Sequence, residues 1–387
     1  MDRRDFLSAL LLSGGALAAP RALRANQLIG GRQPTLILLQ LSGGNDGLNT
    51  LIPYQDPNYY QLRPTLALRP EAMLPLNDEV ALHPALRPLL PAWEAGEWAW
   101  VEGVGYAQPN RSHFRSIDIW HRGSKEITGG WLSRSYSTSS FFEESGTHAV
   151  SLGGGTLPFE GEAGLRFVRF EGDFERDLAQ LAAWQLHDGE SPVESGRLVQ
   201  QLREETILFA RDVQSAPTME SPAGLDGVSK FRKQLRAALK LLTHPTLHVP
   251  VIKLQLKGFD THALQADRHP LLLNELAQGL AVLRRALIRA GRWDDCLVMS
   301  YSEFGRRPRE NGNNGTDHGT AAPHFFLGGR VQGGLYGERP ILDERSLAGA
   351  DLEHRVDFRR LYSTVLSRWF QLPVHPFTDH APIDCLR

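Results

Sequence analysis

Continuous apolar runs of strand length recur along the chain, and each gives way to a polar loop. The runs begin at Thr35, Trp98, His148, Val249 and Cys296. An unbroken apolar run is typical of a strand that is buried on both faces, as in a parallel sheet.

Helical spacing of apolar residues fills much of the sequence between these runs. It predicts helices over residues 83–97, 195–214, 228–242, 267–290 and 352–372. Strand, polar loop and helix alternate several times without an internal sequence repeat. This order predicts an α/β fold in which helices cover both faces of a parallel sheet.

Three other stretches have a composition of their own. Residues 53–82 are rich in proline and predict a surface excursion of loops and turns. Residues 153–225 become glycine-rich and then charged, and we expect an insertion or edge region of the same domain there. Residues 324–336 predict a short strand followed by a glycine-rich hairpin.

Polar residues gather directly after the predicted strands. Ligands of parallel sheets bind at the carboxyl ends of the strands, so these residues are candidates for one shared site. The possible metal ligands are Asp46, Asp260, His262, Glu303, Asp317 and His318.

Carboxylates and imidazoles without cysteines suit a divalent ion such as zinc, manganese or magnesium. Six possible ligands are more than one tetrahedral ion uses, so the site could hold either one ion or two. Asp317 either binds the metal or only orients it. The alternative is that these polar turns merely cap helices in an α/β protein that holds no metal.

Ser112 lies where a loop enters the helix predicted through Trp120. As an ordinary N-cap it needs no function. On the functional interpretation, the exposed amides and the dipole of the helix favour an anionic group beside Ser112, with Arg111 and His113 next to it.

The composition narrows the class of protein. The chain has 387 residues, 41% hydrophobic content and a formal net charge of -2, so we expect a globular protein that binds neither nucleic acid nor an anionic membrane surface. The two cysteines, Cys296 and Cys385, are too few for a disulfide framework. A single disulfide bond between them is the remaining alternative.

The N-terminus is typical of an export signal. Arg3-Arg4 and Phe6-Leu7 precede a short apolar run and small residues, with cleavage after Ala18 or Ala25. This pattern predicts a twin-arginine signal peptide over residues 1–25, recognised by the twin-arginine translocation machinery. We expect one domain over residues 26–387, a periplasmic or secreted location, and no membrane span after cleavage.

Together these motifs resemble the DUF1501 family of exported proteins, which is in turn similar to the alkaline phosphatase and sulfatase superfamily. The resemblance rests on the twin-arginine start and on five motifs. They are Leu-Ser-Gly-Gly-Asn-Asp-Gly-Leu-Asn at 41–49, Asn-Arg-Ser-His-Phe at 110–114, Gly-Phe-Asp-Thr-His at 258–262, Ser-Glu-Phe-Gly-Arg at 302–306 and Gly-Thr-Asp-His-Gly at 315–319. It implies a three-layer α/β/α sandwich with a metal site at the carboxyl ends of its strands.

The resemblance also implies roles for single residues. Asp46 matches a metal-binding Asp after the first strand, and Ser112 falls where the superfamily places its nucleophile. Asp260 and His262 resemble the ligands of one metal, and His318 resembles a late His ligand. Glu303 stands near the ligands of the other metal.

These roles predict a metal-dependent hydrolase of phosphate or sulfate esters, small or polymeric. Ser112 attacks the ester, Arg111 or Arg306 neutralises its oxygens, and water resolves the covalent intermediate. The competing interpretation is an exported metal-binding or ligand-binding protein on the same fold, without turnover.

Overall fold

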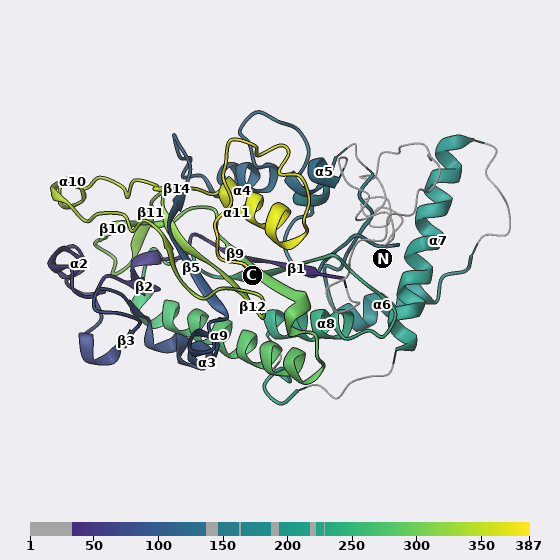
Figure 1. The fold of residues 1–387 in the computed structure, drawn as a ribbon, viewed down its shortest axis with the longest axis horizontal. Coiled ribbons are helices and arrows are strands. Elements are labelled where there is room, and N and C mark those ends of the chain that lie inside the picture. The colour runs from purple at the N-terminus through teal and green to yellow at the C-terminus, as the bar shows by residue number, and fades with distance from the viewer. Residues whose placement is uncertain (1–32, 137–145, 162–163, 187–192, 217–221, 228) are drawn as a thin grey trace.

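The computed structural model describes residues 33–136, 146–161, 164–186, 193–216, 222–227 and 229–387 (Figure 1). The predicted signal peptide over residues 1–25 lies outside the described residues. Export and the two cleavage positions therefore stay predictions.

One large sheet forms the centre of the fold, with strand order β13-β5-β12-β9-β1-β8-β6-β7 and with β14 paired to β5. The strands are β1 (Thr35–Ser42), β5 (Trp98–Gly105), β6 (Ala149–Ser151), β7 (Phe167–Arg169), β8 (Val251–Lys257), β9 (Cys296–Tyr301), β12 (Ala322–Gly328), β13 (Gly334–Gly337) and β14 (Val356–Asp357). β12 runs antiparallel to β5 and β9, whereas the other pairs in this sheet are parallel. The prediction of a mostly parallel sheet is confirmed.

Helices cover both faces of this sheet, as Figure 1 shows. Leu36 and Leu38 of β1 join the core beneath one helical layer, and Ile37 and Leu39 join the core beneath the other. The first layer holds α4 (His113–Arg122), α5 (Trp131–Tyr136), α11 (Arg359–Thr364) and the π-helical segment η7 (Val365–Trp369). The second holds η4 (Pro84–Leu89), α3 (Leu90–Glu94), α6 (Phe174–Ala182), α7 (Glu194–Ser215), α8 (Lys230–Leu242) and α9 (Gln265–Arg289). The predicted three-layer α/β/α sandwich is therefore confirmed.

Smaller elements lie around the sheet. β10 (Arg306–Glu310) and β11 (Thr316–His318) form an antiparallel pair, and β2 (Leu51–Ile52), β4 (Ala81–Leu82) and β3 (Leu74–Pro75) form a small sheet. The short helices are η2 (Gly47–Asn49), α2 (Pro57–Leu62), η3 (Pro70–Ala72), η5 (Leu157–Phe159), η6 (Trp293–Asp295) and α10 (Glu344–Leu347).

Three expectations from the pattern were wrong in detail. The helix expected over 83–97 is split into η4 and α3, with Pro88 inside η4 and Pro91 near the start of α3. The hairpin expected over 324–336 does not form, because β12 and β13 pair with opposite sides of β5. The closing helix starts at Arg359 rather than near 352, because β14 first pairs with β5 and buries Val356.

Two further observations concern the chain as a whole. Cys296 and Cys385 are both free and buried, so they form no bridge. Within the described part of the chain, none of the helices combines the length and the apolar character that a membrane span requires.

Lys253 on β8 is a fully buried cation, and it predicts an unusual dependence of stability on pH. Its ammonium group donates to the Gly153 carbonyl at 3.0 Å and to the Gln40 side chain at 3.3 Å, and burial lowers its pKa to about 7. The same lysine in the unfolded chain keeps its proton up to about pH 10. Between these values the unfolded state binds more protons, so stability rises with pH.

Replacing Lys253 with methionine is expected to remove this dependence. The unfolding free energy of Lys253→Met minus that of the wild type should fall between pH 7 and pH 10, by up to about 1.4 kcal/mol per pH unit. Urea unfolding at both pH values measures it, with Lys257→Met on the exposed end of the same strand as control. A difference that does not change with pH would contradict the buried, easily deprotonated state of Lys253.

Candidate metal centre

The predicted site residues meet at the carboxyl ends of the central strands. β8 runs into the turn that carries Asp260 and His262, and β9 runs into Glu303. His113 enters from the first turn of α4, and His318 ends β11. Asp317 and His318 lie on the strand β11 rather than in a polar turn, and His318 pairs with Arg306 of β10.

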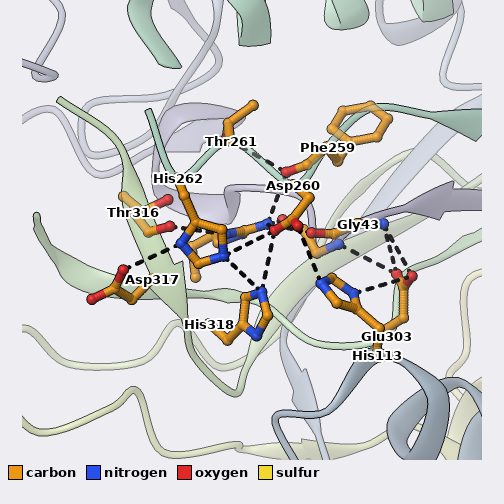
Figure 2. Close-up of polar contacts among 12 residues, drawn as sticks. Gly43, His113, Phe259, Asp260, Thr261, His262, Glu303, Thr316, Asp317 and His318 are labelled. Atoms are coloured by element: carbon orange, nitrogen blue, oxygen red, sulfur yellow. Dashed lines mark hydrogen bonds and ion pairs between the residues drawn. The ribbon is translucent and has the colours of Figure 1, made fainter. Parts of the chain in front are cut away.

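Three imidazole Nε2 atoms surround the Asp260 carboxylate (Figure 2). His262 Nε2 lies 3.1 Å and His318 Nε2 lies 3.2 Å from Asp260 Oδ1, and His113 Nε2 lies 3.5 Å from Oδ2. The Nε2 atoms of His262 and His318 are 2.9 Å apart. Ligand atoms of a tetrahedral zinc ion with bonds of 2.0–2.1 Å are about 3.3 Å from one another, and each of these spacings is close to that value.

The other nitrogen of each ring faces an acceptor. His262 Nδ1 is 3.3 Å from Asp317 Oδ1, His318 Nδ1 is 2.8 Å from the Arg111 carbonyl, and His113 Nδ1 is 3.7 Å from Glu303 Oε1. An acceptor at Nδ1 can hold the proton of the neutral ring on that nitrogen, which leaves a lone pair on Nε2; the Asp260 carboxylate competes for this proton at Nε2 until a cation binds there. The tautomer with its proton on Nδ1 is the one that binds a metal through Nε2.

The short approach of His262 to His318 points in the same direction. When both rings are neutral and carry their protons on Nδ1, their Nε2 lone pairs face each other across 2.9 Å. Two facing lone pairs repel, so a proton or a metal cation must lie between them. Burial lowers the pKa of the His318 imidazole below its ordinary value, which disfavours the extra proton on that ring.

His113 supplies an independent observation. Its Nε2 is buried from solvent and makes no hydrogen bond to the described residues; its 3.5 Å contact with Asp260 Oδ2 is an ion pair only when the ring is protonated. A buried nitrogen without a hydrogen bond costs about 1–3 kcal/mol in free energy of folding. Coordination of a cation beside Asp260 would remove this cost, so the residues present fit a metal ion.

Asp260 is the anionic centre of the group and is open to solvent, with 47% of its side chain exposed. Its partial burial opposes ionisation, but hydrogen bonds from Arg306 and His318 outweigh this and lower its pKa to about 2. Asp260 is therefore a carboxylate at any physiological pH. Its solvent exposure leaves room for water or a substrate beside the imidazoles.

Arg306 lies beneath this centre with a fully buried side chain. Its guanidinium donates to Asp260 Oδ1 at 2.7 Å and also to backbone carbonyls. These carbonyls belong to Gly43, Gly44, Phe259 and Thr316. The prediction that Arg306 neutralises substrate oxygens does not match this placement, because its donors already hold the turns after β1 and β8 together.

Glu303 lies behind His113 rather than among the converging nitrogen atoms. Its carboxylate accepts hydrogen bonds from the Gly43 and Gly44 amides, at 3.0 and 3.3 Å. Burial opposes its ionisation, but the contact with His113 and these amides outweigh it and lower the pKa of Glu303. The carboxylate in turn raises the pKa of His113 and orients its ring.

Gly43 is required where the turns after β1 and β8 meet. Its φ is +122°, and a Cβ atom at this position would lie 2.4 Å from the Asp260 amide nitrogen. Only glycine permits both the conformation and the close approach. Gly43 thus lets the backbone after β1 pack against the turn that carries Asp260 and His262.

Asp46 lies apart from the proposed ligands. Its carboxylate is buried and forms a two-point ion pair with Arg63, with contacts of 2.5 and 2.9 Å. Burial opposes ionisation of Asp46, but the charge and hydrogen bonds of Arg63 outweigh it and keep the pKa of Asp46 lowered. Both oxygens that the resemblance assigns to a metal are therefore committed to a guanidinium.

The described residues thus bring together ligands for one ion. The group of donors that could share a cation consists of His113, Asp260 and His318, and His262 adjoins it through contacts with the last two. His113 stands beside Ser112 in the sequence and is not among the six predicted ligands. Its position after a predicted strand, in the same loop as the candidate nucleophile, is the signal that identifies it.

Asp317 has an orienting position, and its replacement tests this role. It contacts His262 Nδ1 and accepts a hydrogen bond of 3.0 Å from Asn311. We expect Asp317→Asn to weaken zinc binding about 10–100-fold, as outer-shell substitutions of this kind do. Competition with a chromophoric chelator measures the affinity, and exposed Asp267→Asn serves as control. Complete loss of binding would instead indicate that Asp317 is itself a ligand.

Ser112 and Arg111 lie at the entrance of α4, and both are exposed. Ser112 is the N-cap residue of this helix, but its side chain makes no capping hydrogen bond. Arg111 pairs with Asp351 at 3.1 Å and remains 45% exposed. The hydroxyl group next to His113 is therefore not committed to the helix terminus.

Comparisons with known structures find distant similarity over most of the chain. Against Ps i-CgsB the TM-score is 0.41 at 12% identity, covering 91% of this chain and 75% of that one. Against the PsFucS1 sulfatase from Pseudoalteromonas sp. the TM-score is 0.41 at 12% identity, covering 92% and 71%. Against a protein in the alkaline phosphatase superfamily from Vibrio parahaemolyticus it is 0.33 at 12% identity, covering 83% and 67%. Similarity at this level is too distant to carry an activity or a ligand over to this chain.

Comparison with curated protein sequences finds no match. A family model does match, over residues 109–373, and its description is a protein of unknown function, DUF1501. This span is well over half of the chain and includes His113, Asp260, His262 and His318. The chain therefore belongs to the DUF1501 family.

Proposed function

We propose that this chain is a divalent-metal-dependent hydrolase of phosphate or sulfate esters, with Ser112 as its nucleophile. The observation that carries the proposal is the convergence of His113, His262 and His318 Nε2 on the Asp260 carboxylate. Histidine-rich sites with one carboxylate suit zinc or manganese better than magnesium, which prefers oxygen ligands. A bound ion there would supply Lewis-acid polarisation of an ester oxygen.

The position of Ser112 supports its role as nucleophile. It immediately precedes His113 at the start of α4, a helix of 10 residues. The positive end of the helix dipole and the free amides of the first turn favour negative charge at this point. They would stabilise the Ser112 oxygen as it loses its proton, and the anionic ester group that it attacks.

The reaction we propose has two displacements. In the first, Ser112 Oγ bonds to the phosphorus or sulfur atom, the ester bond to the substrate oxygen breaks, and the departing alkoxide gains a proton in place of the one that Ser112 loses. In the second, water attacks the same atom and releases Ser112 with inorganic phosphate or sulfate. Asp260 stays ionised throughout, because its pKa is about 2.

Arg111 is the residue best placed to bind the anionic oxygens of the substrate. Its ion pair with Asp351 is an exposed surface contact, worth at most about 1 kcal/mol. Exchange of Asp351 for an anionic ester group therefore costs little. Arg306 cannot make this exchange, because its buried guanidinium supports Asp260 and the surrounding backbone.

The direct test is an assay of the purified chain after loading with zinc, manganese or magnesium. We expect hydrolysis of aryl phosphates or aryl sulfates that depends on the ion and is lost with a chelator. A chain that binds the ion but cleaves neither ester would support the alternative, a metal-binding protein without turnover. A chain that binds none of the three ions would contradict the proposal.

Export belongs to the proposal as well, on the strength of the N-terminal residues. Arg3-Arg4 and the apolar run behind them are the basis for assigning the protein to the periplasm or the exterior. Fusion of residues 1–25 to a folded reporter tests this. Replacement of both arginines by lysine should keep the reporter in the cytoplasm, and export that survives the replacement would contradict the twin-arginine route.

A further inference from the structure

A single buried amide joins the two segments that carry most of the proposed ligands. Gln265 is the first residue of α9 and is 1% exposed. Its Oε1 accepts hydrogen bonds from Thr261 Oγ1 at 2.9 Å and from Thr316 Oγ1 at 2.7 Å. Both lone pairs of this oxygen are therefore used, one for each segment.

The two threonines lie next to the ligands in sequence. Thr261 lies between Asp260 and His262, and Thr316 is followed by Asp317 and His318. Figure 2 shows Thr261 and Thr316 on the His262 side of the centre, with the His318 imidazole facing that of His262 from the other side. A shift of either threonine is therefore transmitted to a ligand through one or two peptide units.

The nitrogen side of the amide is fixed as well. Gln265 Nε2 donates to Asp46 Oδ2 at 2.5 Å, and Asp46 is itself held by Arg63. This anionic partner accepts only, so the amide nitrogen must face Asp46 and the amide oxygen must face the two hydroxyls. The orientation of Gln265 is thus determined by the buried ion pair.

Other contacts also hold the two segments together, among them a hydrogen bond of 3.0 Å from the Asn311 side chain to the His262 carbonyl. The Thr316 amide donates to the Thr261 carbonyl at 3.2 Å, and Arg306 bridges the carbonyls of Phe259 and Thr316 at 3.0 and 2.8 Å. These contacts hold the backbones of the two segments together. Gln265, by contrast, holds the side chains of Thr261 and Thr316 at the start of α9. Metal sites require their ligands to be held within about 0.5 Å.

We propose that Gln265 is a positioning residue that sets the separation of the His262 and His318 Nε2 atoms and, through it, the affinity for a divalent cation. Gln265 links the ion pair of Asp46 and Arg63 to the proposed metal ligands, none of which that ion pair touches. The buried ion pair of Asp46 and Arg63 thus supports the site without binding the metal. The inference rests on the proposed function for its statement about the cation.

The first experiment replaces Gln265 with methionine, which keeps the length of the side chain but removes its hydrogen bonds. In the metal-free protein labelled with ¹⁵N-histidine, we expect the nuclear magnetic resonance signals of His262 and His318 to broaden or split. In the same variant, affinity for zinc alone should fall about 10–100-fold. Gln278→Met, on an exposed face of the same helix, should change neither.

The second experiment reverses one hydrogen bond. Gln265→Glu alone places a second carboxylate against Asp46 and should weaken zinc binding at least as much as methionine. Adding Asp46→Asn restores the total charge beside Arg63 and lets the new amide donate to the new carboxylate, at the loss of one of the two Arg63 contacts with residue 46. The double variant should bind zinc more tightly than Gln265→Glu alone, a recovery that general damage to the fold would not give.

The outcomes separate this inference from the proposed function. Unchanged histidine signals in Gln265→Met, or zinc affinity within twofold of a wild type that binds zinc, would overturn the positioning role. Failure of the double variant to recover would also count against it. A wild type that binds no zinc would overturn the proposed function, while the signals of the metal-free protein would still decide the role of Gln265.

Discussion

Replacing Asp260 with asparagine is expected to lower the affinity for zinc by on the order of 10³-fold, beyond the 10–100-fold typical of outer-shell partners. The variant keeps the volume of the side chain but loses the one anion that lies beside all three imidazoles. Three neutral nitrogen ligands then face a divalent cation without charge compensation. Isothermal titration of the metal-free protein with zinc measures the effect.

Two features of this prediction make it specific. Asp118→Asn, on α4 and ion-paired with Arg115 and Arg122, removes a carboxylate near the site without touching the imidazoles, and should leave zinc affinity unchanged. The Asp260→Asn variant should also lose ester hydrolysis together with the ion. Zinc affinity equal to that of the wild type would exclude Asp260 as a ligand.

Replacing Ser112 with alanine should separate catalysis from metal binding. We expect kcat to fall by on the order of 10³-fold or more, because the nucleophile is absent, while zinc content is unchanged. Stability should also be unchanged. A serine that caps a helix contributes about 1 kcal/mol, but the Ser112 side chain makes no capping hydrogen bond.

Thermal unfolding and steady-state kinetics of the same samples test both parts. Ser124→Ala, in the turn that follows α4, controls for loss of a serine hydroxyl near the helix. A variant with full activity would exclude Ser112 as nucleophile. A variant that is active but clearly less stable would instead support the ordinary N-cap interpretation that the sequence left open.

The strands that position the site follow from the hydrophobic pattern, and the reason is physical. β1, β8 and β9 are neighbours in the centre of the sheet, so each must be apolar on both faces, and such runs stand out in a sequence. The polar turns after them are then forced to one edge. The errors occur where edge elements such as β13 and β14 are short and half polar, and their pairing depends on distant contacts.

The hydrophobic pattern does not predict which side chains of the site contact one another. The approach of Asp260, His262 and His318 follows from their place at strand ends, but a residue type does not reveal its partner. Arg63, which pairs with Asp46, comes from the proline-rich stretch that predicts only loops. Likewise, Glu303 lies behind His113 because the amides of Gly43 and Gly44 bind its carboxylate, a contact across 260 positions of the chain.

X-ray absorption at the zinc edge, on the wild-type chain loaded with one equivalent of zinc, tests the proposed ligand set. We expect one bound ion per chain, a first shell of nitrogen and oxygen at about 2.0–2.1 Å, and the outer-shell scattering of three imidazoles. In His113→Ala the imidazole count should fall to two. An ion that shows no imidazole scattering, or the same count in both proteins, would contradict a centre built from His113, His262, His318 and Asp260.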